Sequence, residues 1–163
     1  MKNKKVLFLT QAALIAALYV VLTFVANAFG LASGAIQVRL SEMLLILPAF
    51  TPAAIPGVYI GCMLSNLLTG CSLLDILLGS IATLIGAIGA HLLRKYKWLI
   101  TIPNIIANMV IVPYVLIASY GLQDAWWYLV LTVGIGEIIS CGIFGMLLYF
   151  PFKKHAKHIF HAS

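Results

Sequence analysis

Most of this sequence consists of apolar stretches that are about as long as a membrane is thick. Runs such as residues 6–29 and 100–120 contain no Lys, Arg, Asp or Glu. Hydrophobic residues make up 63% of the chain and charged residues 9%, whereas a soluble domain carries about 25% charged residues. A water-soluble fold of this composition would expose apolar patches over most of its surface. The sequence therefore predicts an integral membrane protein.

The chain length predicts an all-α bundle of six transmembrane helices. A spanning helix needs about 20 residues, so 163 residues leave no room for a separate soluble domain, and we expect one transmembrane domain over residues 1–163. The first run is longer than the apolar core of a signal peptide, roughly 7–15 residues, and we expect a retained helix there. The expected spans are residues 6–29, 35–50, 53–68, 73–93, 100–120 and 125–152.

The basic residues predict how these helices are oriented. Cytoplasmic loops of membrane proteins carry an excess of Lys and Arg. If both termini lie in the cytoplasm, every Lys and Arg except Arg39 lies on the cytoplasmic side. These residues form three clusters, which we interpret as the flanks of membrane helices rather than as a nucleic-acid site. The clusters are Lys2, Lys4 and Lys5; Arg94, Lys95 and Lys97; and Lys153, Lys154 and Lys157.

Several chemistries have no support in the sequence. There is no G-x-x-x-x-G-K-[ST] loop for ATP and no H-E-x-x-H motif, and the histidines of the basic C-terminal tail have a spacing that suits no fixed metal geometry. The cysteines show no C-x-x-C pair, and we interpret them as packing residues. We therefore expect no enzymatic activity, cofactor or metal. The cysteines are Cys62, Cys71 and Cys141.

All four acidic residues fall in the outer part of this topology. Glu137 lies near mid-membrane in the segment GIGEIIS, far in sequence from any basic residue. A carboxylate in the membrane is costly and by default marks a cavity or a transport path. Asp124 stands in a loop and is most simply a surface residue. The candidate substrate-binding residues are Arg39, Glu42, Asn66, Asp75, Asn108, Trp126, Trp127 and Glu137.

Most of these candidates also have a structural interpretation, and the sequence alone leaves it open. Arg39 and Glu42 stand three residues apart and could pair on one helix. The two asparagines could hydrogen-bond neighbouring helices. Asp75 could lie at the membrane interface, and the two tryptophans could belong to an interfacial aromatic belt.

Small residues and prolines predict local features of the second and third spans. Gly57, Gly61 and Ser65 recur at steps of four and predict a close helix contact. A series of prolines precedes them and should break the helix, because proline lacks the amide hydrogen that a helix needs. The prolines are Pro48, Pro52 and Pro56.

Four segments together resemble one transporter family over nearly the whole chain. They are AALIAALYVVLT from Ala12, GAIQVRLSEMLLILPAFTPAAIPGVYIGCMLSNLL from Gly34, LLDILLGSIATL from Leu73 and VGIGEIIS from Val133. The sequence is similar to the QueT family, the queuosine-precursor substrate-binding (S) components of energy-coupling factor (ECF) transporters. The Arg-x-Ser-Glu segment with its prolines is fairly specific, whereas many S components share the alanine face.

The resemblance implies a multi-pass protein of the prokaryotic plasma membrane that captures an aminomethyl-deazaguanine outside the cell. It implies a transmembrane coupling subunit and two cytoplasmic ATPases as partners. The ligand carries a cation and paired N–H donors, which carboxylates accept well, and Trp126 or Trp127 could stack on its ring. Small side chains on the first helix would form the docking surface for the coupling subunit. They are Ala12, Ala13, Ala16 and Ala17.

Two other functions are compatible with the sequence. One is a homodimeric, proton-coupled exporter of small cations that uses Glu137 as its carboxylate. Such an exporter works alone, whereas an S component transports only with its coupling subunits. The other is a purely structural membrane subunit, which would bind no ligand.

Overall fold

The structure, a computed structural model, describes residues 4–31 and 36–159, and within these ranges the regular structure is helical. The α-helices are α1 (Lys4–Ala28), α2 (Ala54–Leu68), α3 (Ser80–Leu92), α4 (Ile102–Tyr120), α5 (Trp126–Glu137) and α6 (Gly145–Ile159). A 3₁₀ helix, η1 (Leu40–Ala49), lies between α1 and α2. Two π-helical segments, η2 (Asp75–Gly79) and η3 (Ile138–Phe144), lead into α3 and join α5 to α6.

Within the described residues, four helical segments are long and apolar enough to cross a membrane, and they agree closely with four of the expected spans. The other two expected spans are shorter helices, with 10 residues in η1 and 15 in α2. At about 1.5 Å per residue in the α-helix and about 2.0 Å in the 3₁₀ helix, neither reaches the roughly 30 Å of the hydrocarbon core. Residue 35, the expected start of the second span, lies outside the described residues. The four long segments are Lys4–Ala28, Asp75–Leu92, Ile102–Tyr120 and Trp126–His155.

The short helix η1 occupies the interior of the bundle. It packs against α1, α3, α6 and η3, and most of its side chains are buried. Hydropathy cannot distinguish such a segment from a lipid-facing one, because both are apolar. The helix ends at Ala49 and α2 begins at Ala54, so the break predicted from the prolines is confirmed.

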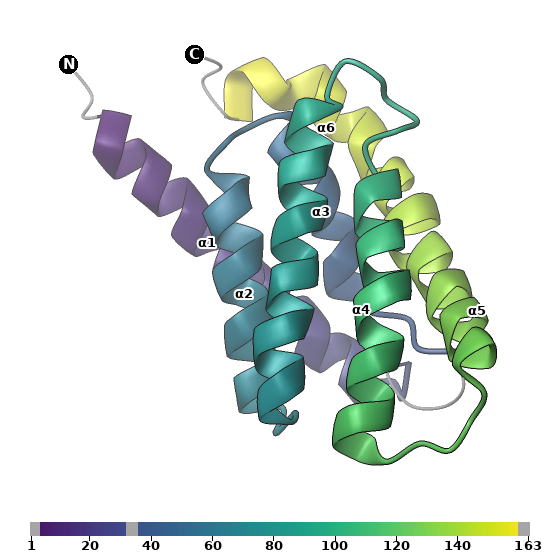
Figure 1. The fold of residues 1–163 in the computed structure, drawn as a ribbon. Helices are drawn as coiled ribbons and strands as arrows, with labels where there is room; N and C mark the ends of the chain where they lie inside the picture. Colours follow the sequence, from purple (N-terminus) through teal and green to yellow (C-terminus); the bar gives the residue numbers. More distant parts are fainter. Residues whose placement is uncertain (1–3, 32–35, 160–163) are drawn as a thin grey trace.

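The predicted small-residue contact lies between α1 and α2, where α1 crosses obliquely (Figure 1). A Cβ atom added at Gly57 would come 2.9 Å from the Ala12 carbonyl oxygen, and one at Gly61 would come 2.7 Å from Tyr19 Cβ. Ala16 is buried in the same contact. The glycines therefore let the two backbones approach closely.

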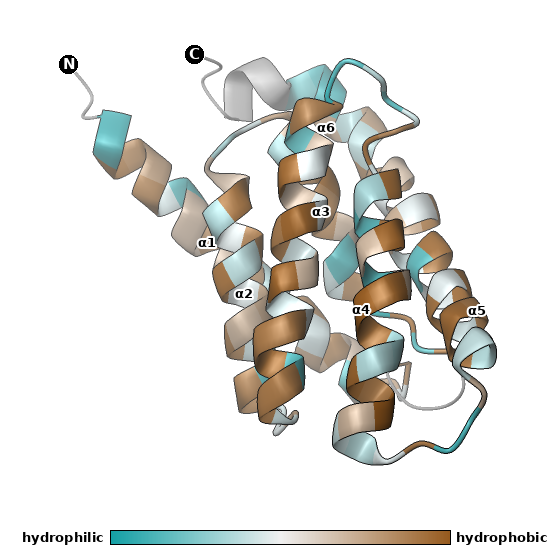
Figure 2. Cartoon of the chain, viewed as in Figure 1, coloured by the Kyte–Doolittle hydropathy of each residue, from teal (hydrophilic) through white to brown (hydrophobic). Residues whose placement is uncertain are grey.

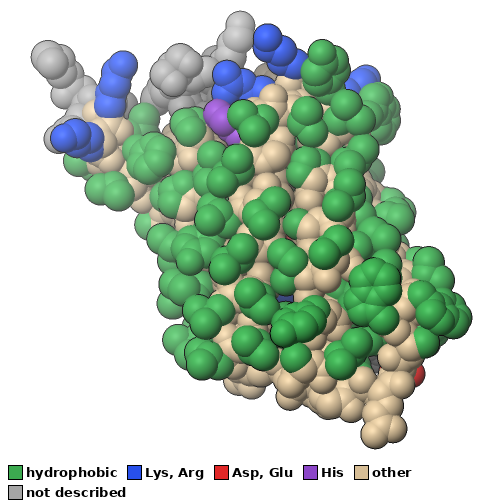
Figure 3. Space-filling view, viewed as in Figure 1, with side chains coloured by type: hydrophobic (Ala, Val, Ile, Leu, Met, Phe, Trp, Pro, Cys, Tyr) green, Lys and Arg blue, Asp and Glu red, His purple; other side chains and the backbone are tan. Residues whose placement is uncertain are grey.

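The two ends of the bundle differ in charge. The start of α1, the end of α6 and the loop between α3 and α4 lie at one end (Figure 1), and most of the visible Lys and Arg side chains gather there (Figure 3). Apolar residues cover the helices between the two ends (Figure 2). The grouping of the basic clusters agrees with the predicted topology, and the side of the membrane that this end faces stays a prediction.

Candidate functional site

A buried hydrogen-bond network joins two glutamates through one asparagine. Asn104 Nδ2 donates to Glu42 Oε2 at 3.0 Å and to Glu137 Oε2 at 2.9 Å. The Tyr19 hydroxyl donates to Glu42 Oε1, and Asn108 Nδ2 donates to Asn104 Oδ1 at 3.2 Å. Glu42 is 1% exposed and Glu137 6%. The network therefore holds two carboxyl groups in fixed positions inside the bundle.

Backbone features of three helices place these side chains. A Cβ atom added at Gly86 of α3 would lie 2.3 Å from Asn104 Oδ1, so only glycine leaves room for this amide. Glu137 is the last residue of α5, where the π-helical segment η3 begins. Such π-helical turns occur frequently at functional sites. The Arg39 backbone N–H donates to Ser140 Oγ at 3.0 Å, which ties the start of η1 to η3.

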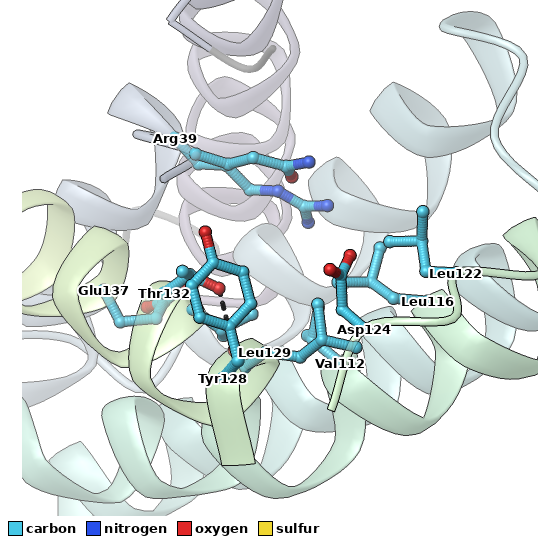
Figure 4. A pocket seen from close by; sticks show the side chains of 11 residues that line it. Arg39, Val112, Leu116, Leu122, Asp124, Tyr128, Leu129, Thr132 and Glu137 are labelled. Atoms are coloured by element: carbon cyan, nitrogen blue, oxygen red, sulfur yellow. Dashed lines mark hydrogen bonds between the residues drawn. The ribbon is translucent and has the colours of Figure 1, made fainter. Parts of the chain in front are cut away.

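A first cavity of about 290 Å³ adjoins this network. Figure 4 shows Arg39 extending along one side of it, with Glu137 and Asp124 at opposite flanks. Apolar side chains and the Tyr128 ring line much of the remainder. The cavity is lined by Gln37, Arg39, Val112, Leu116, Leu122, Asp124, Tyr128, Leu129, Thr132, Val133 and Glu137.

A second cavity of about 460 Å³ is also lined by Arg39. The two cavities share four lining residues and are therefore adjacent. Hydroxyl and amide side chains are more numerous in the second cavity. It is lined by Thr23, Ala26, Asn27, Gln37, Arg39, Asn66, Thr69, Cys71, Asp75, Leu116, Tyr120 and Leu122.

Arg39 faces Asp75 rather than Glu42. A guanidinium nitrogen lies 3.9 Å from Asp75 Oδ2, and the Tyr120 hydroxyl lies 3.4 Å from the same oxygen. Asp75 Oδ1 is buried and has no hydrogen-bond partner among the described residues. Asn66 Nδ2 donates to the Asp75 carbonyl oxygen at 3.3 Å. The pairing of Arg39 with Glu42 that the sequence allowed is therefore not observed.

Six of the eight candidate residues lie in this region. Glu137, Arg39, Asn66 and Asp75 line a cavity, whereas Glu42 belongs to the network behind Glu137 and lines neither cavity. Asn108 bonds to Asn104 of the same helix. The remaining two candidates are 55% and 63% exposed and line neither cavity, so the expected aromatic lid is not seen. They are Trp126 and Trp127.

The four alanines of the expected docking surface separate into two pairs. Ala12 and Ala16 are buried, and both contact α2. Ala13 and Ala17 are exposed. Of these four alanines, only Ala13 and Ala17 are therefore accessible to a docking partner.

Sequence reasoning missed several residues of the site. Asn104 is fully buried and bridges both glutamates. It stands four residues before Asn108, one helical turn away, and this spacing is the sequence pattern that could have identified it. Tyr19 continues the buried face of α1. Asp124, interpreted as plain surface, lines the first cavity, and so does Tyr128 in place of the tryptophans.

Comparison with known proteins gives one family and one relative. The chain matches the family model described as QueT transporter over residues 9–154. It is 37% identical over 98 residues to the queuosine precursor transporter QueT of Lactococcus lactis subsp. cremoris (strain MG1363). The match covers 60% of this chain and 57% of that relative, which is less than two thirds of either. No solved structure matches the chain.

Proposed function

We propose that this chain, which belongs to the QueT transporter family, is the substrate-binding subunit of an ATP-driven importer of the ECF type. Its substrate is a queuosine precursor, an aminomethyl-deazaguanine, which it captures from outside the cell. The sequence contains no ATP-binding loop of the G-x-x-x-x-G-K-[ST] type. The energy for transport therefore comes from partners: a transmembrane coupling subunit and two cytoplasmic ATPases.

The observation that carries this proposal is the surplus of carboxyl groups around the two adjoining cavities. Glu137 and Asp124 line the first cavity and Asp75 the second, and among the described residues Arg39 is the one cationic side chain that lines either of them. Glu137 and Asp75 are buried, whereas Asp124 is exposed. Buried charge is costly unless it is paired. A ligand that brings a cation and several N–H donors would supply the missing partners.

The first cavity suits the planar part of such a ligand. Val112, Leu129 and the Tyr128 ring provide apolar walls on which a flat heterocycle can pack. Glu137 lies at one flank, and a carboxylate accepts two adjacent N–H donors in a bidentate arrangement. Because Asn104 already holds this carboxyl group, little reorganisation is needed on binding.

Binding tests the proposal directly. The purified protein should be stabilised in a thermal-shift assay, and should bind in isothermal titration, with 7-aminomethyl-7-deazaguanine. Guanine and riboflavin serve as controls and should bind much more weakly. If the deazaguanine does not bind, or binds no better than riboflavin, the proposed substrate is wrong.

Uptake tests the proposed partners. Cells that produce this chain together with a coupling subunit and both ATPases should accumulate labelled ligand, and cells that produce the chain alone should not. Proton-coupled export by the chain alone would contradict the proposal and support the exporter alternative, in which Glu137 carries the proton.

The exposed alanines on α1 are the proposed docking surface for the coupling subunit. Ala13→Trp should block uptake and leave ligand binding unchanged, because Ala13 is exposed and lies in neither cavity. Ala16→Trp should instead unfold the protein, because Ala16 lies against Gly61. A normal uptake rate in Ala13→Trp would exclude this surface.

The orientation in the plasma membrane can be tested by cysteine labelling. In a background with Cys71→Ser, an impermeant thiol reagent added to whole cells should miss Tyr96→Cys and label Gln123→Cys. The reason is that position 96 lies in the basic loop, which we place in the cytoplasm. Labelling at position 96 would overturn the proposed topology.

A further inference from the structure

We infer that the ligand is held at two separate points, with Asp75 in the second cavity receiving an ammonium group while the first cavity holds the planar ring. This inference rests on the proposed function and assigns the two ends of the ligand to different carboxyl groups. It makes Asp75 the residue that selects for a substituent on the ring.

The two cavities are adjacent, and Arg39 lines both. Gln37, Arg39, Leu116 and Leu122 line both. At about 290 Å³, the first cavity lies at the lower end of ligand pockets, which span roughly 300–1,000 Å³. A fused bicyclic ring fits within a cavity of that size, and the adjacent second cavity offers room for a substituent on the ring.

Asp75 is the buried group of this site that lacks adequate partners. It is 4% exposed. Its Oδ1 atom has no hydrogen-bond partner among the described residues. Among the described residues, its Oδ2 atom has two long contacts, to Arg39 at 3.9 Å and to the Tyr120 hydroxyl at 3.4 Å. A buried carboxylate held this loosely gains much from a cation that comes into direct contact.

The chemistry of the two cavities decides which end of the ligand each one takes. Flat apolar walls in the first cavity suit an aromatic ring, as described above. The second cavity places hydroxyl and amide groups around Asp75, which suits a compact, strongly hydrated ammonium. Those groups belong to Thr23, Asn27, Asn66, Thr69 and Tyr120.

Arg39 occupies the place that the ammonium takes. Its side chain is the present cationic neighbour of Asp75, although 3.9 Å is too long for a hydrogen bond. Its backbone N–H is fixed by Ser140, so its side chain can move while the chain around it stays in place. The ligand ammonium therefore replaces Arg39 at Asp75.

The test compares two ligands that differ only in the ammonium. Isothermal titration measures 7-aminomethyl-7-deazaguanine and 7-methyl-7-deazaguanine against the wild-type protein and Asp75→Asn. Wild type should prefer the aminomethyl ligand by about ten- to a hundredfold, the factor expected for a charged hydrogen bond. Asp75→Asn should lose this preference and keep its affinity for the methyl ligand.

Two further variants keep the inference testable if Asp75→Asn does not fold. Asp124→Asn removes a carboxylate from the first cavity and should change both affinities by the same factor. Arg39→Gln removes the competitor of the ammonium, so it should increase the preference for the aminomethyl ligand. Melting temperatures of all variants establish that they are folded.

The outcomes separate this inference from the proposed function. If wild type binds both ligands but the preference persists in Asp75→Asn, the inference is wrong and the function stands. The same holds if Asp124→Asn abolishes the preference, or if Arg39→Gln leaves it unchanged. If wild type binds neither ligand, the proposed function and this inference fail together.

Discussion

The protein holds its buried carboxyl groups in two different ways. Glu42 and Glu137 share the Asn104 amide at 3.0 and 2.9 Å, and Glu42 also accepts a hydrogen bond from Tyr19. Asp75 has only long contacts through one oxygen and none through the other among the described residues. In the first arrangement each glutamate has a close hydrogen-bond donor from the protein. In the second, the aspartate has no donor closer than 3.4 Å among the described residues.

The difference has a physical meaning. A polar network in a low-dielectric interior stabilises one packing arrangement when every member is satisfied, and it is costly when a member is not. The glutamate network therefore should contribute to folding and hold Glu137 in place. Asp75 should contribute little to folding and much to ligand selection. Substitutions at the two places should then affect stability very differently.

Asn104→Leu should have the largest effect. Both glutamates lose a hydrogen bond to a carboxyl group, each worth roughly 1.5–3 kcal/mol, so the free energy of unfolding should fall by about 3–6 kcal/mol. Chemical unfolding in detergent micelles measures this loss. Asn108→Leu, which removes only the bonds to Asn104, should cost much less. Equal losses in the two variants would contradict the central place of Asn104.

Tyr19→Phe should come next. It removes the hydroxyl that donates to Glu42 and keeps the buried ring. The expected loss in the free energy of unfolding is roughly 1.5–3 kcal/mol, measured in the same way. Tyr120→Phe removes the distant donor to Asp75 and the acceptor of the exposed Ser72 N–H. It provides the comparison and should have a small effect. If Tyr120→Phe proved the more damaging change, the contrast between the two regions would be wrong.

Gly86→Ala should disturb the network indirectly. The added methyl would lie 2.3 Å from Asn104 Oδ1, so the amide must shift. Overpacking of this kind costs about 1–3 kcal/mol. Gly142→Ala is the control, because a Cβ atom there meets its neighbour at 3.8 Å, an ordinary contact. A Gly86→Ala protein as stable as the control would mean that the α3–α4 contact can adjust freely.

Asp75→Asn should have the smallest effect on stability. The change removes a buried charge that has poor partners, so the free energy of unfolding should change by less than about 1 kcal/mol, in either direction. Unfolding measured beside Glu42→Gln gives the comparison, because Glu42→Gln should be clearly destabilising. A large loss of stability in Asp75→Asn would show that its pairing with Arg39 is structural.

The helices could be predicted where an apolar stretch of sequence also lies on the outside of the bundle. The helices at Lys4–Ala28 and Ile102–Tyr120 are exposed on the outside of the bundle along much of their length, and their apolar runs matched the observed bounds closely. Residues 35–50 were not confirmed as a span, because η1 is short and is surrounded by other helices. A single sequence carries no information on which apolar surface meets lipid and which meets protein.

The site could be predicted only in part for a related reason. Intramembrane carboxyl groups are conspicuous, so Glu42, Asp75 and Glu137 were identified from the sequence. Their partners were not, because Asn104 lies 62 residues from Glu42 and 33 from Glu137, and only the packing of three helices brings them together. The rotation of α5 also could not be predicted, and it places Tyr128 rather than the tryptophans at the cavity.

The most direct test of the account is the affinity of Glu137→Gln for 7-aminomethyl-7-deazaguanine, measured by isothermal titration beside wild type and Glu42→Gln. Glu137 lines the first cavity and Glu42 does not. Glu137→Gln should bind the ligand about ten- to a hundredfold more weakly, because a charged hydrogen bond is lost, and Glu42→Gln should lose stability more than affinity. Unchanged affinity in a folded Glu137→Gln protein would remove this carboxyl group from the binding site and contradict the account.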